Sequence, residues 1–122
     1  PYFSLSHAGS YAVCAVHSQP IGVDLDLPRC TIAISERFFH PNEISFLQTL
    51  SRDAQKDALL RLWTAKEAVY KQSCKNVFAP DKTEVGGNNI DYFITENFVA
   101  AVAFDGKTQF DFLRCENGKF FE

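Results

Sequence analysis

The sequence predicts an α+β fold in which an antiparallel sheet packs on one long helix. Apolar residues recur at helical spacing through the middle of the chain, over residues 51–73. Alternating or continuous apolar runs flank this segment on both sides and predict strands. These runs cover residues 3–6, 11–16, 21–27, 91–95, 98–104 and 108–113. Strands gathered at the two ends of the sequence, rather than alternating with helices, indicate the α+β class.

The composition indicates one domain spanning residues 1–122. The chain is 46% hydrophobic and 22% charged, which suffices for a single core without disulfides. Its four cysteines form no C-x-x-C pair and favour a reduced, cytoplasmic protein. A net charge of -3 argues against nucleic acid as a partner, and no apolar run is long enough to span a membrane. The start at Pro1 and the absence of methionine predict that an N-terminal part is missing.

The first strands differ in pattern. Residues 3–6 alternate, and the turn-forming residues 7–10 follow them. Residues 11–16 are almost continuously apolar, which predicts a central strand buried on both faces, with Cys14 as a buried thiol. Residues 21–27 alternate again, which predicts a strand with one apolar and one polar face.

Three helices are predicted between the strands. A short one lies near residues 31–39, and a second begins after His40 with Pro41 at its first position. The long helix over residues 51–73 has Ser51 or Asp53 as its cap. Near the C-terminus, Asp105-Gly106 predicts a hairpin turn into a strand over residues 108–113.

Asp24 and Asp26 form the first candidate site. Two positions apart on a strand, their side chains leave the same face, roughly 6 to 7 Å apart at the backbone. Two carboxylates can share one hard cation with water and phosphate oxygens, as Mg²⁺ prefers. The alternative is an ordinary solvated strand face that carries two acids.

The long helix supplies the second set of candidates. Lys66 lies within the apolar stripe of the helix, where a charge is costly unless it is paired or reaches solvent. Glu67 and Lys71 are one turn apart on the same side of the helix. They form either part of a site or an ordinary surface ion pair.

Three weaker signals in the sequence suggest a phosphate-binding histidine, a P-loop and a hydrolase triad. His7 either donates to a phosphate or is an exposed turn residue. Gly106-Lys107-Thr108 resembles the end of a P-loop, but position 101 is Ala where that motif needs Gly. Ser6-His7 suggests a hydrolase triad, but no serine lies in a G-x-S-x-G elbow. The P-loop and the triad are therefore rejected.

Taken in order, four blocks of the sequence resemble the surfactin-type phosphopantetheinyl transferases. The blocks read FSLSHAG at 3–9, QPIGVDLD at 19–26, RFF at 37–39 with Glu43, and WTAKEAVYK at 63–71. The combination of W-x-x-K-E-x-x-x-K with S-H and G-V-D is specific to this family. The blocks cover more than half of the chain and match the second half of the family fold, which is a pseudo-dimer of two similar halves.

The resemblance implies an activity and its substrates. Such enzymes move the 4′-phosphopantetheine arm of coenzyme A onto a serine of an acyl or peptidyl carrier protein and release 3′,5′-ADP. Coenzyme A binds in the cleft between the two halves. If the first half is absent, the resemblance implies that self-association completes the cleft.

The resemblance also implies roles for individual residues. Asp24, Asp26 and Glu67 are ligands of Mg²⁺, and Glu67 helps to deprotonate the acceptor serine. Lys71 contacts the phosphate under attack. In addition, Ser6 and His7 hold the 3′-phosphate of coenzyme A, and Lys66 lies near the phosphopantetheine.

Two departures from the family pattern limit these expectations. Asp26 stands where the family usually has Glu, which leaves open a ligand that acts through water and a preference for Mn²⁺. The residues after Lys71, QSCKNV at 72–77, lack the usual glycine, so contacts with the carrier protein there are open. Two other functions remain: a non-catalytic half-domain that binds carrier proteins, and a metal-dependent phosphodiester hydrolase.

Overall fold

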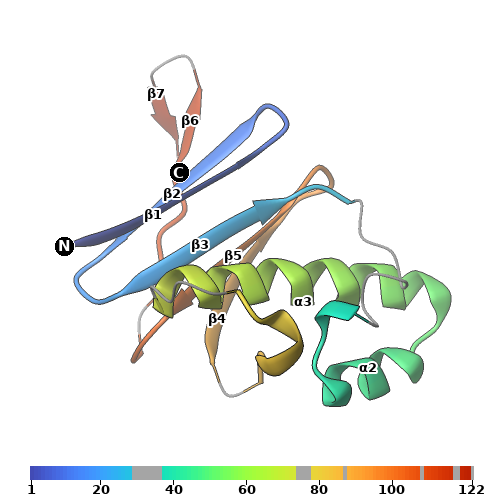
Figure 1. The fold of residues 1–122 in the computed structure, drawn as a ribbon. Helices are drawn as coiled ribbons and strands as arrows, with labels where there is room; N and C mark the ends of the chain where they lie inside the picture. The colour runs from blue at the N-terminus through green and yellow to red at the C-terminus, as the bar shows by residue number, and fades with distance from the viewer. Residues whose placement is uncertain (29–36, 74–77, 87, 108, 117–118, 122) are drawn as a thin grey trace.

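A computed structural model describes residues 1–28, 37–73, 78–86, 88–107, 109–116 and 119–121, and it confirms the α+β class. Two sets of strands flank two α-helices in the sequence, and the sheets are antiparallel (Figure 1). Among the described residues, no helix is both long and apolar enough to cross a membrane.

The central sheet has three strands in the order β3-β5-β4. They are β3 (Ile21–Asp26), β4 (Asn89–Ile94) and β5 (Val99–Phe104). The central strand is β5, whose six residues are all buried, and its continuous apolar run suits a strand covered on both faces. The register places Asp24 opposite Ala101 and Asp26 opposite Val99. The two acids therefore lie toward the end of β3 that is paired with the start of β5.

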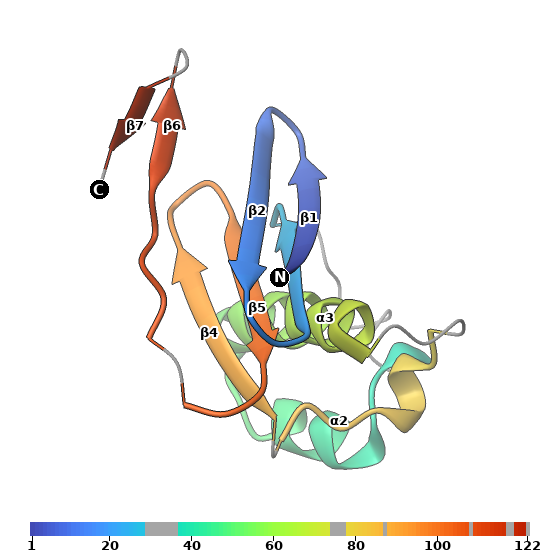
Figure 2. The same cartoon turned by 90° about the vertical axis from the view of Figure 1, so that its left-hand side faces the viewer.

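A two-stranded hairpin, β1 (Tyr2–Ala8) and β2 (Tyr11–His17), packs on one face of this sheet (Figure 2). Gly9, with φ 58°, provides the left-handed residue that its tight turn needs. The prediction of a central strand over residues 11–16 is wrong. Within the described chain, β2 pairs with β1 alone, and Cys14 and Val16 are exposed. The apolar run reflects a hairpin with one covered face and one open face.

Serine side chains join β1 to the edge of β3. The Ser4 hydroxyl accepts a hydrogen bond from the Val23 N–H at 3.0 Å, and the Ser6 hydroxyl accepts one from the Leu25 N–H at 3.1 Å. These hydroxyls take the place that backbone carbonyls would hold in a continuous sheet. The hairpin is thereby fixed beside β3 without ladder pairing.

The helices begin where the sequence predicts. Helix α2 (Pro41–Gln48) has Pro41 at its first position, and the Glu43 carboxylate accepts from the His40 N–H at 3.0 Å. Helix α3 (Arg52–Ser73) follows Ser51, whose hydroxyl accepts from the Ala54 N–H at 3.3 Å. The short helix expected near residues 31–39 lies largely outside the described residues. A single 3-10 turn, η1 (Pro80–Lys82), follows α3.

Helix α3 covers the other face of the sheet through small residues (Figure 1). Ala65 and Ala68 pack against Ala101 and Ala103, and all four are essentially inaccessible to solvent. At Gly22 the approach is closest, since a Cβ atom there would lie 2.0 Å from the Ala68 carbonyl oxygen. The backbone of α3 therefore lies directly on β3, beside the two aspartates.

The C-terminal segment differs from its prediction. Residues 109–113 form no strand, and the hairpin lies later, between β6 (Arg114–Glu116) and β7 (Lys119–Phe121). The aromatic residues of the predicted strand pack on the sheet as side chains instead. The Phe110 ring lies 4.8 Å from Phe104, and the Phe112 ring lies 4.8 Å from Phe93.

Candidate active site

Three carboxylates from two elements meet where α3 crosses β3. Asp24 and Asp26 point from β3 toward the helix, and Glu67 points from α3 toward them. One oxygen of each carboxylate lies within 4.8 Å of the others. The shared face of the aspartates was predicted correctly, but it is no solvated surface, because Asp24 is 4% and Asp26 2% exposed.

The three carboxylates carry like charges, lie close together and are largely shielded from water. Burial, followed by the charges of Asp24 and Asp26, raises the pKa of Glu67 to about 7. Burial also raises the pKa of Asp24, although the nearby Lys71 ammonium opposes this effect. In the metal-free chain a proton is therefore retained between these carboxylates at a pH where isolated acids have lost theirs.

Lys71 lies beside the cluster, one helical turn after Glu67. Its ammonium donates to Asp24 Oδ1 at 3.1 Å, to the Val23 carbonyl oxygen at 3.0 Å and to the Leu5 carbonyl oxygen at 3.2 Å. Its side chain is 31% exposed. Lys71 thus brings a positive charge to the acids, and it remains accessible from solvent.

Ser6 and His7 lie on opposite sides of β1, because neighbouring side chains of a strand alternate. Ser6 points inward, and its hydroxyl donates to Asp24 Oδ1 at 3.0 Å. His7 lies within β1 rather than in the turn where the sequence placed it, and it is exposed. The structure therefore brings Ser6, but not His7, to the carboxylates.

Lys66 lies in the interior instead of at the carboxylate cluster. It is fully buried, and its ammonium forms an ion pair with Glu43 Oε1 at 2.5 Å. Burial lowers its pKa, while the Glu43 carboxylate opposes that shift. The sequence signalled that a charge in the apolar stripe needed a partner. It gave no sign that the partner was Glu43, which lies in another helix.

The chemistry of the three carboxylates fits a hard divalent cation. Such ions bind carboxylate oxygens and retain coordination positions for water or phosphate. Three closely spaced acids also repel one another, and this repulsion adds to the larger effect of burial in raising the pKa of Glu67. A cation at this place would relieve it.

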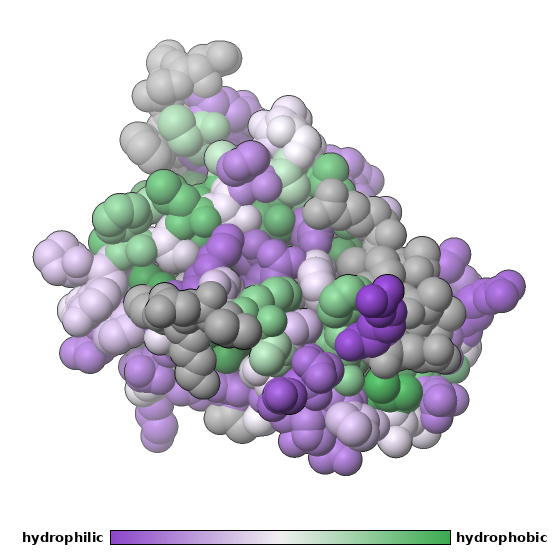
Figure 3. All heavy atoms as spheres, in the orientation of Figure 1, coloured by the Kyte–Doolittle hydropathy of each residue, from purple (hydrophilic) through white to green (hydrophobic). Residues whose placement is uncertain are grey.

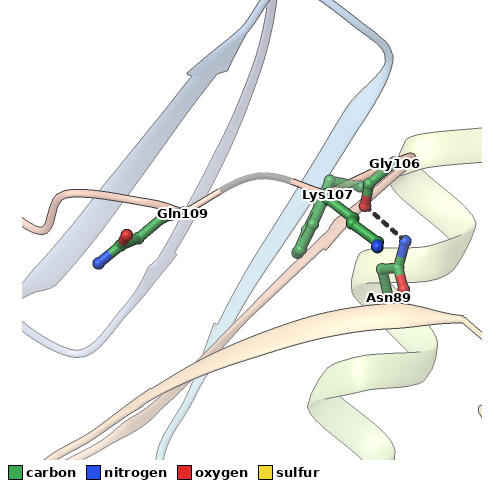
Figure 4. A pocket seen from close by; sticks show the side chains of 5 residues that line it. Asn89, Gly106, Lys107 and Gln109 are labelled. Carbon is green, nitrogen blue, oxygen red and sulfur yellow. Dashed lines mark hydrogen bonds between the residues drawn. The ribbon is translucent and has the colours of Figure 1, made fainter.

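The surface around this region is mixed in character. In the space-filling view, hydrophilic residues gather in the middle of the face, above α3, with hydrophobic residues beside them (Figure 3). A separate hollow of about 430 Å³ lies where β5 ends, lined by Asn89, Phe104, Gly106, Lys107 and Gln109 (Figure 4). The Asn89 amide donates to the Gly106 carbonyl oxygen there at 2.8 Å. None of its lining residues is a carboxylate, and Phe104 is paired with Ile21, far along β3 from Asp26.

Comparison with known proteins decides the family. The model of the 4′-phosphopantetheinyl transferase superfamily matches residues 20–106, which include all three carboxylates. The chain belongs to the 4′-phosphopantetheinyl transferase superfamily. The predicted resemblance is thereby confirmed.

Curated relatives of this superfamily match the same chain over part of their length. A 4′-phosphopantetheinyl transferase of Bacillus subtilis is 44% identical over 80 residues, which are 65% of this chain and 36% of the relative. The 4′-phosphopantetheinyl transferase Sfp of Bacillus subtilis strain 168 is 38% identical over the same shares. The 4′-phosphopantetheinyl transferase gsp of Aneurinibacillus migulanus is 35% identical over 65% of this chain and 34% of its own. The chain spans about a third of the length of these relatives.

Proposed function

We propose that this chain carries the catalytic carboxylates of a 4′-phosphopantetheinyl transferase. The enzyme would move the phosphopantetheine arm of coenzyme A onto a serine of an acyl or peptidyl carrier protein and release 3′,5′-ADP. The observation that supports this proposal most directly is the meeting of Asp24, Asp26 and Glu67 within a chain of this superfamily.

The cation of this site is proposed to be Mg²⁺, with Mn²⁺ as the alternative. Asp24, Asp26 and Glu67 would hold it, since each offers an oxygen to the same space. When bound, a divalent cation supplies a positive charge that stabilises the negative charge of a diphosphate during transfer. The family usually has Glu at the position of Asp26. The shorter Asp26 is therefore the ligand that would determine the preference between Mg²⁺ and Mn²⁺.

Glu67 and Lys71 are proposed to assist the transfer itself. The acceptor hydroxyl forms a bond to the β-phosphorus of coenzyme A, while the bond from that phosphorus to the oxygen of 3′,5′-ADP breaks. Glu67 accepts the proton of the hydroxyl, directly or through water. Lys71 places its ammonium at the phosphate and neutralises charge on the departing oxygen. Its partial exposure and its place beside Asp24 support this role.

Coenzyme A would be held in part by β1. We assign its 3′-phosphate to Ser6 and His7, on the strength of the resemblance. Since these side chains leave β1 on opposite sides, this assignment requires the phosphate to lie at the edge of the strand, or β1 to turn. The inward bonds of Ser6 make it the less available of the two residues in the free chain.

We also propose how the chain is organised, what completes its cleft and where in the cell it acts. Residues 1–122 form one domain, supported by the packing of α3 on the sheet and of the hairpin on its other face. A first half or a second copy completes the cleft for coenzyme A. The cytoplasm suits Cys14 and Cys115, which are free thiols within the described residues.

Mass spectrometry of an apo carrier protein tests this function. The carrier is incubated with the chain, coenzyme A and Mg²⁺, and parallel reactions contain chelator or the Glu67→Gln variant. Glu96→Gln is the matched control, because Glu96 is exposed in the turn between β4 and β5. We expect a gain of about 340 Da, which requires the metal and Glu67 and is unaffected at Glu96.

The other outcomes distinguish the alternatives. Release of 3′,5′-ADP without a gain in carrier mass would indicate a phosphodiester hydrolase. Binding of the carrier without either product, at all metal concentrations, would indicate a non-catalytic half-domain. Full transfer by Glu67→Gln would refute the assignment of Glu67.

A further inference from the structure

Lys66 and Glu43 form a buried polar hub that joins three parts of the fold. The ammonium of Lys66 donates to the carbonyl oxygens of Pro80 and Thr83 as well as to Glu43. Glu43 Oε2 accepts from the Val85 N–H at 3.0 Å. The hub therefore ties α2, the middle of α3, and η1 with the residues that follow it to one another.

The bonds of the hub leave Lys66 without a donor for a substrate. A lysine ammonium has three N–H donors, and Glu43, Pro80 and Thr83 supply three acceptors. The side chain is also sealed from solvent, with 0% exposure. Within the described residues Lys71 also donates to Leu5, Val23 and Asp24, but it is 31% exposed, so a phosphate can reach it and replace one of these acceptors.

The hub supplies a directional contact in the middle of α3, directly before Glu67, and Gln55 and Lys71 supply others toward the two ends of the helix. On the sheet side, α3 rests on alanines, and apolar contacts of this kind do not fix the rotation of a helix about its axis. Hydrogen bonds and an ion pair require defined directions. Lys66 directly precedes Glu67, and adjacent residues point about 100° apart around a helix. Holding Lys66 in the hub therefore helps to set the direction in which Glu67 leaves α3, together with the bonds of Lys71 one turn later.

We propose that Lys66 is a positioning residue, whose hub with Glu43 orients α3 so that Glu67 faces Asp24 and Asp26, and that it is no ligand of coenzyme A. This inference rests on the proposed function for the role of Glu67. The claim that Lys66 is sealed off depends on the fold alone.

Chemical labelling of lysines tests the sealed state without any substitution. The native chain is treated with acetic anhydride, with and without coenzyme A, and each lysine is followed by peptide mass spectrometry. Lys56, exposed on the same helix, serves as the internal control. We expect Lys66 to react about a thousandfold more slowly than Lys56 in both conditions, because only the unfolded fraction exposes it. Rapid labelling of Lys66 that coenzyme A prevents would overturn the proposal.

Substitution tests the orienting role through metal affinity, measured by Mn²⁺ titration in the absence of substrate. Lys66→Met leaves Glu43 buried without its partner, and we expect the midpoint of thermal unfolding to fall by about 10 °C. Lys56→Met is the control and should leave both quantities unchanged. We expect Mn²⁺ affinity to fall about tenfold in Lys66→Met, as for other residues that orient metal ligands.

A double variant separates orientation from stability. Glu43→Gln/Lys66→Met removes both buried charges, so it should recover much of the lost thermal stability and stay folded. We expect its Mn²⁺ affinity to remain about tenfold below that of the wild type. Wild-type affinity in this folded variant would refute the orienting role. If the wild-type chain itself bound no Mn²⁺, the proposed metal site would fail, and the labelling result would still decide whether Lys66 is sealed.

Discussion

Replacing Glu67 by glutamine should change how the stability of the metal-free chain depends on pH. The usual pKa of this side chain is 4.5, and burial beside Asp24 and Asp26 raises it to about 7. Between these two values the folded chain keeps a proton that the unfolded chain has lost. Raising the pH through this window therefore favours the unfolded state. The contribution of Glu67 to stability is complete below about pH 4.5 and is lost as the pH rises toward 7.

The size of the effect follows from the two pKa values. Their difference corresponds to about 3 kcal/mol of folding free energy. Glu67 is only partly buried, and solvent screening reduces this figure, so we expect about 2 kcal/mol. The raised pKa of Asp24 acts with the same sign. Glutamine has no proton to lose, so Glu67→Gln should flatten the profile by that amount.

Urea unfolding provides the assay, with chelator present and the pH varied from about 5 to about 8. The fluorescence of Trp63, which is packed against Phe39 and Phe78, reports the transition. Glu96→Gln is again the control and should keep the wild-type slope. Saturating Mg²⁺ should stabilise the wild type increasingly as the pH rises, because the cation binds the deprotonated acids.

Two results would refute this reasoning. Equal slopes for the wild type and Glu67→Gln would mean that burial and the neighbouring aspartates do not raise the pKa of Glu67 in the folded chain. Stability that rises with pH between about 5 and 7 in the metal-free wild type would show that Glu67 is ionised in the fold, contrary to its raised pKa.

Two further substitutions test the geometry around the site. Gly22→Ala would place a Cβ atom 2.0 Å from the Ala68 carbonyl oxygen, so we expect a loss of more than about 3 kcal/mol in urea unfolding. Gly86→Ala, whose Cβ atom would lie 3.9 Å from a Glu84 carboxylate oxygen, is the control and should change stability by less than about 1 kcal/mol. Lys71→Met should lower kcat about 100-fold and weaken coenzyme A binding less than tenfold. The control Lys56→Met should leave both quantities unchanged. A larger loss in binding than in kcat would show that Lys71 only positions the substrate.

The sequence predicted the elements of the fold better than their burial. Period-two alternation over residues 21–27 correctly indicated a strand whose acids share a face. It could not reveal that α3 covers this face, because tertiary contacts decide what lies opposite a strand. The same limitation explains the error over residues 11–16. An apolar run is compatible with burial on both faces and with a hairpin that has one open face, as at Cys14 and Val16.

The candidate site was predictable to a similar extent. Spacing alone suggested that Asp24 and Asp26 lie together, and the family blocks added Glu67. The contacts of Lys66 could not be predicted, since its partners come from α2, from η1 and from Thr83 after it. The sequence did show a charged residue within the apolar stripe of a helix. A charge in such a position indicates that a buried partner should be sought in the structure.

The serine hydroxyls between β1 and β3 determine how this edge of the fold can open. Two side-chain acceptors hold the Val23 and Leu25 amides, and each hydroxyl can rotate away and let water take its place. The hairpin can therefore lift from β3 without breaking the ladder of the central sheet. Native-state hydrogen exchange should then show these two amides opening as a separate unit, ahead of the amides that pair β3 with β5.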